Sequence, residues 1–269
     1  MSVIEALGLG LLQGTTEFLP ISSSGHLVVA RAWLGIAEPP LLFDVVLHVA
    51  TLVVICWRFR RRLAALLRAG ALLATGRAAA ADREDLRLLA AVVAATAATA
   101  VVGLTVSRFL LPWARTLTVV SVAFIATAAI LLATRLRRKS PHGGEPGLWL
   151  AIAVGVAQGV AVLPGISRAG ITVAACLIGG MNRRRAGELA FLVSVPAVLG
   201  ALALTLGDAR GLIRETGATS LAVGFAAALV TGALCLRALL AVLHRDRLAW
   251  FAVYLLPLGA FGLLVGRTI

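Results

Sequence analysis

The sequence predicts an all-α polytopic membrane protein, formed as a single integral membrane domain over residues 1–269. Hydrophobic residues make up 60% of the chain and charged residues only 14%, and the mean hydropathy is +0.99. Soluble domains contain about 45–50% apolar and about 25% charged residues. A water-soluble globule of this length could not bury so much apolar surface, and disorder is excluded for the same reason. The pattern of long and interrupted apolar stretches predicts six transmembrane helices plus two re-entrant helical hairpins in an inverted repeat.

The apolar stretches differ in whether they are continuous. A helix that crosses a bilayer needs about 20 apolar residues. The stretches that qualify as full spans are approximately 41–57, 87–106, 116–134, 186–206, 219–241 and 249–266. Two others are interrupted: residues 3–35 by Pro-Ile-Ser-Ser-Ser-Gly at 20–25, and residues 148–180 by Pro-Gly-Ile-Ser-Arg-Ala-Gly at 164–170. Each interrupted stretch predicts two half-helices around a polar turn, which is a re-entrant hairpin.

The charges in the connecting loops predict the orientation. Residues 58–87 contain eight arginines and residues 135–139 four basic residues, whereas 107–115 and 207–218 contain two arginines each. Because cytoplasmic loops carry the excess of Lys and Arg, we expect the basic loops in the cytoplasm and both termini outside. The first hairpin then enters from outside and the second from the cytoplasm. The formal net charge of +13 has the same origin. No basic stripe is interleaved with aromatic residues, so we expect no nucleic-acid partner.

An internal repeat relates the two interrupted stretches. Gln13-Gly and Gln158-Gly lie 145 positions apart, as do Ile21-Ser and Ile166-Ser. Three full spans follow each hairpin, and an odd number forces the two halves into opposite orientations. This is the inverted-repeat plan, in which discontinuous helices meet near the midplane. The repeats cover about 1–134 and about 148–269, with a basic linker at 135–147.

Ionisable residues at membrane depth are candidates for function, because burying a charge in hydrocarbon is costly. Gln13 and Glu17 are spaced i, i+4 and share one face of a half-helix. They predict either a pair of oxygen ligands for a hard cation or, for Glu17, a carboxylate base. The structural alternative is a helix cap or an interhelical hydrogen bond.

The first polar turn contains hydroxyl groups and a histidine. Its residues are Ser22, Ser23, Ser24, Gly25 and His26. Successive backbone N–H groups with small side chains can hold phosphate oxygens, and a serine close to a histidine can act as a nucleophile with its base. The alternative is a serine-rich helix N-cap with the histidine buried in the core.

The second polar turn contains a positively charged side chain, that of Arg168. Arg168 needs a counter-charge, and its planar guanidinium suits phosphate or carboxylate oxygens. The alternative is a structural ion pair with Glu17 or Glu188. Ser167 precedes the arginine, and Thr172 lies four residues later on the same helix face.

Four further polar residues are interpreted either as contacting the site residues without touching the ligand or as forming a stabilising network. They are Asp44, His48 and Thr51, which share one stripe, and Glu188. Together the polar residues predict a buried pocket at the junction of the hairpins, suited to a ligand with a phosphate head and a hydrophobic tail. A lipid-phosphate transporter would need the arginine and the turn amides but not a histidine beside a serine, and a lipid-binding scaffold would leave the charges unexplained.

Two segments resemble the bacterial undecaprenyl-diphosphate phosphatases, also known as bacitracin-resistance proteins. Residues 13–26, Gln-Gly-Thr-Thr-Glu-Phe-Leu-Pro-Ile-Ser-Ser-Ser-Gly-His, resemble the family's (E/Q)xxxE element and its Ser/His turn. Residues 164–172, Pro-Gly-Ile-Ser-Arg-Ala-Gly-Ile-Thr, resemble its PGxSRSxxT element. Residues 43–51 and 188–196 are also similar to the family, so the resemblance covers essentially the whole chain.

The resemblance implies hydrolysis of undecaprenyl diphosphate, which recycles the lipid carrier of cell-wall synthesis. It implies a divalent cation, Mg²⁺ or Ca²⁺, held by Gln13 and Glu17, and a multi-pass protein of the bacterial cell (inner) membrane whose site opens to the outer side. The site residues that it implies are Glu17, Ser23, His26, Ser167, Arg168 and Thr172. The oligomeric state is not predicted, and a homodimer is one possibility.

Two departures from the family pattern bear on activity. Ala169 replaces the second serine of the second element, which removes one hydroxyl donor. Gln13 is the amide variant of the first motif position and keeps an oxygen ligand without a charge. We expect an active enzyme with altered cation dependence. The nucleophile is Ser23 with His26 as its base, His26 itself or a water, and we favour the first.

Overall fold

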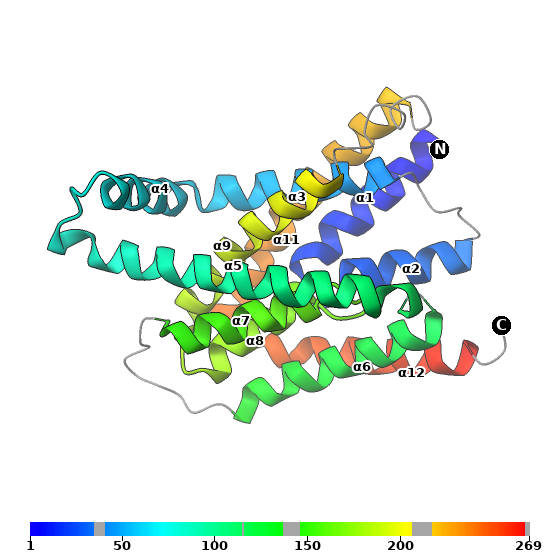
Figure 1. Cartoon of the computed structure of the whole chain (residues 1–269). Helices are drawn as coiled ribbons and strands as arrows, with labels where there is room; N and C mark the ends of the chain where they lie inside the picture. The colour runs from blue at the N-terminus through cyan, green and yellow to red at the C-terminus, as the bar shows by residue number, and fades with distance from the viewer. Residues whose placement is uncertain (35–40, 115, 137–145, 206–216, 267–269) are drawn as a thin grey trace.

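The computed structural model describes residues 1–34, 41–114, 116–136, 146–205 and 217–266. These residues form helices joined by short turns and contain no strand (Figure 1). The α-helices are α1 (Val3–Phe18), α2 (Ser23–Leu34), α3 (Leu41–Arg58), α4 (Arg60–Ala74), α5 (Arg83–Phe109), α6 (Leu117–Ala133), α7 (Leu148–Val160), α8 (Arg168–Ile178), α9 (Arg183–Thr205), α11 (Ala218–His244) and α12 (Ala252–Val265).

Five of the described helical segments are long and apolar enough to cross a membrane. They are Ala80–Phe109, Leu117–Leu136, Arg183–Ala203, Ala218–His244 and Leu248–Val265. The predicted all-α, multi-pass membrane fold is therefore confirmed. The remaining predicted span, 41–57, coincides with α3 but is not among these five segments. The exact number of spans stays a prediction.

Both predicted hairpins form, and each breaks where the sequence places its polar turn. α1 ends at Phe18 and α2 begins at Ser23, with Pro20 between them and Ser22 at a φ of 69°. α7 ends at Val160 and α8 begins at Arg168. Gly165 in the second turn has a φ of 95°, a conformation that glycine adopts without steric cost. The half-helices are too short to cross a bilayer alone.

The hairpins pack against helices from the other half of the chain. α1 lies along α11, and α7 lies along α5 (Figure 1). Glycines bring these backbones close together, as is common between helices in membranes. A Cβ added to Gly14 would lie 2.8 Å from the backbone nitrogen of Gly232, and one added to Gly155 would lie 2.8 Å from Cα of Ala95. The division into two repeats stays a prediction.

The two hairpins open toward opposite ends of the bundle. The first opens toward the beginning of α11, where the Ser220 hydroxyl donates to the Met1 carbonyl at 3.2 Å. The second opens toward the beginning of α5, because Met181 after α8 and Arg87 on α5 line one cavity. The tips of the hairpins therefore meet in the middle of the bundle.

Candidate active site at the hairpin tips

The hairpin tips are joined through the Ser22 hydroxyl. Its oxygen accepts the backbone N–H of Gly165 at 3.1 Å and that of Gly25 at 3.3 Å. Gly25 has no room for a side chain, since an added Cβ would lie 2.7 Å from the Phe124 ring and 2.8 Å from the Gly165 nitrogen. Ser24 contributes a hydroxyl 3.4 Å from that of Ser22. The polar turn is thus a structural joint as well as a candidate phosphate-binding element.

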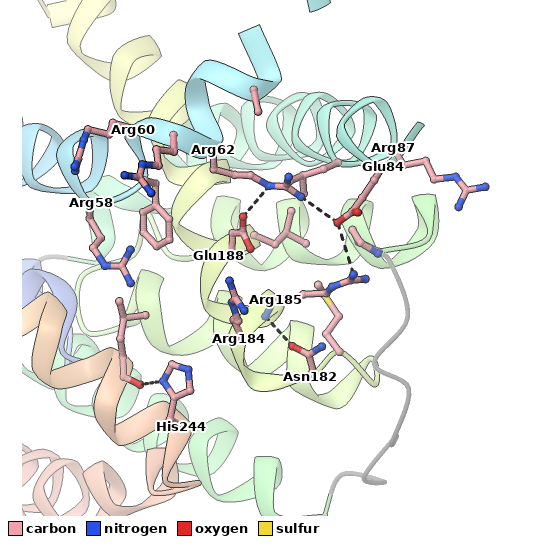
Figure 2. A pocket seen from close by; sticks show the side chains of 18 residues that line it. Arg58, Arg60, Arg62, Glu84, Arg87, Asn182, Arg184, Arg185, Glu188 and His244 are labelled. Carbon is pink, nitrogen blue, oxygen red and sulfur yellow. Dashed lines mark hydrogen bonds and ion pairs between the residues drawn. The ribbon is translucent and has the colours of Figure 1, made fainter. Parts of the chain in front are cut away.

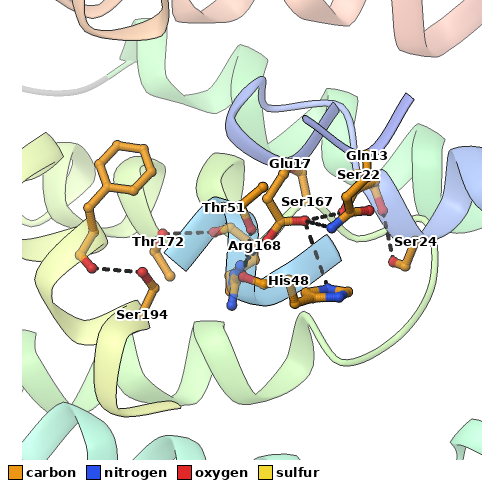
Figure 3. Close-up of polar contacts among 12 residues, drawn as sticks. Gln13, Glu17, Ser22, Ser24, His48, Thr51, Ser167, Arg168, Thr172 and Ser194 are labelled. Carbon is orange, nitrogen blue, oxygen red and sulfur yellow. Dashed lines mark hydrogen bonds and ion pairs between the residues drawn. The ribbon is translucent and has the colours of Figure 1, made fainter. Parts of the chain in front are cut away.

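The Glu17 carboxylate is the centre of the polar network (Figure 3). Its side chain is 4% exposed. One oxygen, Oε1, pairs with the Arg168 guanidinium across 151 residues of sequence. The other, Oε2, accepts the Ser23 hydroxyl at 2.5 Å and the Gln13 amide at 3.0 Å. The predicted proximity of these four residues is therefore present in the structure.

Arg168 is positioned by the start of α8. Ser167 caps this helix, its hydroxyl accepting the Gly170 N–H at 3.1 Å. The Thr172 hydroxyl donates to the Arg168 carbonyl at 2.7 Å, so it holds the helix and does not point at the carboxylate. Thr127 on α6, which the sequence analysis missed, donates to the Gly165 carbonyl at 2.9 Å and accepts the Ser167 N–H at 3.2 Å.

His26 has partners other than the ones that we expected. Its Nδ1 lies 2.7 Å from the Ser22 carbonyl and its Nε2 lies 2.8 Å from the Tyr254 hydroxyl. Because a carbonyl can only accept, Nδ1 carries the hydrogen and a neutral ring accepts from Tyr254 at Nε2. The Tyr254 ring also stacks on the imidazole, with centroids 5.7 Å apart and an interplanar angle of 12°.

These contacts correct the predicted pairing of Ser23 with His26. The Ser23 hydroxyl donates to Glu17, and both nitrogens of His26 are engaged elsewhere. The reason is geometric: the imidazole is held between the Ser22 carbonyl, one helical turn before His26, and the Tyr254 hydroxyl. The carboxylate is thus the nearer base. Tyr254 is the only tyrosine in the chain, and nothing in its apolar surroundings in the sequence marked it.

The residues predicted to support the site divide into two groups. His48 approaches it, with Nε2 4.0 Å from Glu17 Oε2 and Nδ1 2.8 Å from the Asp44 carbonyl. Glu188 does not, because its carboxylate lies 2.8 Å from Nε of Arg62, in a different cavity. The prediction that Glu188 stands beside the hairpin tips is therefore corrected: it lies near the beginning of α9, next to the arginines that end α3 and begin α4.

A small cavity adjoins the ion pair. It has a volume of about 10 Å³ and is lined by Glu17, Arg168, Thr172 and Ser194, with Phe18 and Phe191 as its principal apolar walls. This volume holds about one water molecule. The cavity in this state is too small for a phosphate group.

The oxygen ligands available to a cation are few. Among the described residues, no group of three or more His, Cys, Asp or Glu side chains could hold a metal ion. The Gln13 Oε1 atom is buried and has no hydrogen-bond partner in the described part of the chain. Together with Glu17 it offers two oxygen donors. Mg²⁺ is commonly held by one or two protein oxygens plus water and substrate phosphates, so the residues fit a cation that the substrate helps to bind.

Comparison with known proteins places this arrangement in a family. The family model described as bacitracin resistance protein BacA matches residues 6–261. The chain belongs to this family. An undecaprenyl-diphosphatase of Treponema denticola is 39% identical over 261 residues, covering 96% of both chains. One of Rubrobacter xylanophilus is 38% identical over 272 residues, covering 97% of both. One of Carboxydothermus hydrogenoformans is 35% identical over 266 residues, covering 96% of this chain and 95% of the relative.

The two segments that carried the resemblance to the BacA family are the two hairpin tips. Residues 13–26 supply the carboxylate, the serine and the histidine, and residues 164–172 supply the arginine. At Ala169, where the family element has a serine, the methyl side chain is 7% exposed among apolar neighbours. The Glu17–Arg168 pair is formed without a hydroxyl at this position.

Proposed function

We propose that this membrane protein hydrolyses undecaprenyl diphosphate to undecaprenyl phosphate and inorganic phosphate, returning the lipid carrier to cell-wall synthesis. The observation that carries the proposal is a buried carboxylate that receives a serine hydroxyl and an arginine where two half-helices begin. The relatives named undecaprenyl-diphosphatase, which match nearly the whole chain, support the same activity.

The site binds the diphosphate with positive groups from both hairpins. α2 and α8 begin at the tips, and the N-terminus of a helix favours phosphate through its free N–H groups and its dipole. The Arg168 guanidinium, once released from Glu17, offers two parallel donors to phosphate oxygens. Phosphoryl transfer depends on such charge neutralisation and on in-line positioning more than on covalent chemistry.

The first chemical step uses Ser23 as the nucleophile and Glu17 as its base. Ser23 Oγ attacks the terminal phosphorus while its proton moves to Glu17 Oε2. The bond from this phosphorus to the bridging oxygen breaks, and undecaprenyl phosphate leaves and takes the proton from Glu17. His26 holds the turn through Ser22 and Tyr254.

The second step releases the phosphate. A water attacks the phosphoserine, and Glu17 accepts one of its protons. The bond between phosphorus and Ser23 Oγ breaks, and Glu17 passes that proton to the serine oxygen. Inorganic phosphate leaves with the other hydrogen of the water, and the enzyme returns to its starting state.

A divalent cation, Mg²⁺ or Ca²⁺, would be held by Glu17 and by the Gln13 Oε1 atom, which has no hydrogen-bond partner among the described residues. When bound, it supplies charge neutralisation for the phosphate oxygens. With one neutral ligand in place of a carboxylate, the protein contributes less charge to the site. The cation requirement is therefore met at a higher concentration than a two-carboxylate site would need.

Phosphate release from undecaprenyl diphosphate by the purified protein in detergent tests the proposal. It is measured with Mg²⁺, with Ca²⁺ and with a chelator. Arg168→Ala is expected to lose about 2.7–4 kcal/mol of transition-state stabilisation, as for a lost oxyanion donor. Arg108→Ala, which removes an exposed arginine near the end of α5, is the matched control. Near-normal turnover by Arg168→Ala at normal protein level would exclude this role.

The nucleophile is tested by trapping the covalent intermediate. Rapid quenching followed by mass spectrometry is expected to find phosphate on Ser23, and Ser23→Ala to abolish both the adduct and turnover. Ser107→Ala, which removes a hydroxyl bonded only locally to the Leu104 carbonyl, is the control. Phosphate found on His26 would make the histidine the nucleophile. Turnover that survives Ser23→Ala without any adduct would make water the nucleophile.

A lipid-phosphate transporter is the second candidate, because broken helices that meet at mid-depth are also a transporter plan. The phosphate-release assay separates the two functions. Folded protein that releases no phosphate under any cation condition, yet moves the labelled lipid between the leaflets of a vesicle, would be a transporter.

The proposed setting is the bacterial cell membrane, with the basic helix ends in the cytoplasm and the site open to the outer side. Trp113, between α5 and α6, is 78% exposed, and Thr75 follows α4. In a cysteine-free background, an impermeant maleimide added to whole cells is expected to label Trp113→Cys and not Thr75→Cys. The reverse pattern would invert the orientation.

A further inference from the structure

A large cavity lies away from the hairpin tips, at the end of the bundle that carries most of the arginines (Figure 2). Its volume is about 1160 Å³. It is formed where α3 ends, where α4, α5 and α9 begin, and where α11 ends. The positive-inside rule assigns this end to the cytoplasm, but a topology signal requires only basic loops. Here five helix ends converge on one hollow.

The walls of this arginine cavity carry an excess of positive charge. Seven arginines and two glutamates line it. Arg62 pairs with both glutamates: its Nε lies 2.8 Å from Glu188 and its NH2 lies 3.4 Å from Glu84. Arg62 also pairs with Asp85 at 2.6 Å, just outside the lining. Glu84 also pairs with Arg185, whose NH2 lies 3.6 Å from its carboxylate. The carboxylates of Glu84, Asp85 and Glu188 are therefore all paired with Arg62 or Arg185.

Arg58 and Arg60 line the cavity without an acidic partner in the described part of the chain, but they lie over the rings of Phe59 and Trp57. Two further lining arginines have neither an acidic partner nor a ring contact among the residues that the structure describes. They are Arg61, on the first turn of α4, and Arg184, on the first turn of α9. Neither forms a hydrogen bond or an ion pair with another described side chain. Both are exposed to solvent, so a ligand reaches them without displacing a protein contact.

The floor of the cavity is apolar and rigidly packed. Leu189 is fully buried, Met181 is 4% exposed, and Leu88 and Phe59 are 7% and 9% exposed. An apolar floor below unpaired guanidinium groups is suited to an anion that also has carbon atoms to bury. Guanidinium groups match phosphate oxygens in pairs, and the volume exceeds what a single phosphate would fill.

Three aromatic rings separate this cavity from the Glu17 site. Phe59, on the floor, stacks on Phe191 at a centroid distance of 6.0 Å and an angle of 24°. Phe191 in turn contacts Phe18 at 6.0 Å and 58°. Phe191 and Phe18 line the small cavity that contains Glu17. The two cavities are therefore neighbours with separate walls.

We propose that the arginine cavity is a second phosphate-binding site, in which Arg61 and Arg184 hold a phosphate or diphosphate group. The group is carried either by the headgroup of an anionic lipid or by a soluble phosphate. This site is independent of the hydrolytic reaction, because it shares no lining residue with the small cavity at the hairpin tips.

Binding to the full-length protein in an uncharged detergent tests the proposal with two probes. Inorganic pyrophosphate is titrated by calorimetry at physiological salt. Micelles containing phosphatidylglycerol are compared with micelles containing phosphatidylcholine by the shift in thermal unfolding. Arg61→Gln and Arg184→Gln are each expected to weaken binding about tenfold or more, the effect of losing one charged hydrogen bond. Arg68→Gln, an exposed arginine on the same helix as Arg61 but outside the cavity, is expected to bind normally.

The outcomes identify the carrier of the phosphate and the cavity that binds it. Pyrophosphate binding that requires Arg184 indicates a soluble ligand, and stabilisation by phosphatidylglycerol alone indicates a lipid headgroup; either supports the proposal. Binding must persist in Arg168→Ala, which alters only the Glu17 site. Absence of binding by both probes, an equal loss in Arg68→Gln, or a loss only in Arg168→Ala would overturn it.

Discussion

Replacing Arg168 by leucine is expected to destabilise the protein more than replacing Glu17 by glutamine. The Glu17 side chain is 4% exposed, whereas that of Arg168 is 26% exposed. A guanidinium that loses its partner can turn toward water, since arginine carries its charge on a long flexible stem. The Glu17 carboxylate has no such route and would remain buried, with Ser23, Gln13 and, at 4.0 Å, His48 as its remaining partners.

The structure sets the size of this difference. Removing one member of a buried ion pair costs about 3–5 kcal/mol. Two hydrogen bonds still reach Glu17, so we expect the lower end, about 3 kcal/mol, for Arg168→Leu. Glu17→Gln removes the charge that needs a partner and keeps a polar group, and we expect a cost of about 1 kcal/mol. The double variant buries no charge and is expected to recover roughly 2 kcal/mol relative to Arg168→Leu, because the two changes are coupled.

Unfolding in detergent, followed by tryptophan fluorescence against temperature and denaturant, measures these differences. Arg108→Leu is the control for loss of an exposed arginine and should unfold like the unaltered protein. All three variants of the pair should release phosphate at least about a hundredfold more slowly than the unaltered protein, so the assay separates folding from activity. Arg168→Leu with unaltered stability, or a double variant less stable than Arg168→Leu, would refute the assignment of Glu17 as a buried anion.

Two further substitutions test the geometry of the tips. Gly25→Ala is expected to abolish phosphate release and to cost about 1–3 kcal/mol of stability, the usual effect of overpacking, because the new methyl group would lie 2.7 Å from the Phe124 ring. Gly8→Ala, on the open side of α1 where nothing lies within 4 Å, is the control, and equal effects of the two would contradict the close contact at the tips. Tyr254→Phe removes the hydroxyl that bonds His26 and is expected to lower turnover up to about tenfold, the value of one net hydrogen bond, with protein level unchanged. Unaltered turnover in this variant would show that the histidine needs no support from α12.

The hairpins and the central ion pair could be predicted from the sequence because their signals are local. Proline and a run of serines end a helix wherever they occur, so the break between α1 and α2 was visible without a structure. A lone arginine in an apolar region requires a carboxylate, and few carboxylates were available. Glu17 was therefore among the expected partners of Arg168, and the structure pairs them.

The contacts that sequence reasoning missed depend on packing between distant segments. Tyr254 reaches His26 across 228 residues, and a tyrosine in an apolar span has many ordinary explanations. Glu188 was expected near the hairpin tips because it opens an apolar span, but its partner Arg62 is fixed by the approach of α4 to α9. No spacing along the chain encodes that approach. The bond from Ser23 to Glu17 depends on how sharply the turn folds back.

The packing of α1 against α11 also determines the order in which the chain can be completed during its synthesis. Ribosomes add roughly 5–20 residues per second, so α1 waits for roughly 10–40 s before the glycines of α11 that receive it exist. Glu17 waits as well, because its arginine is encoded 151 residues later. Until the second hairpin has been made, the Glu17 carboxylate lacks the guanidinium that pairs with it in the finished protein.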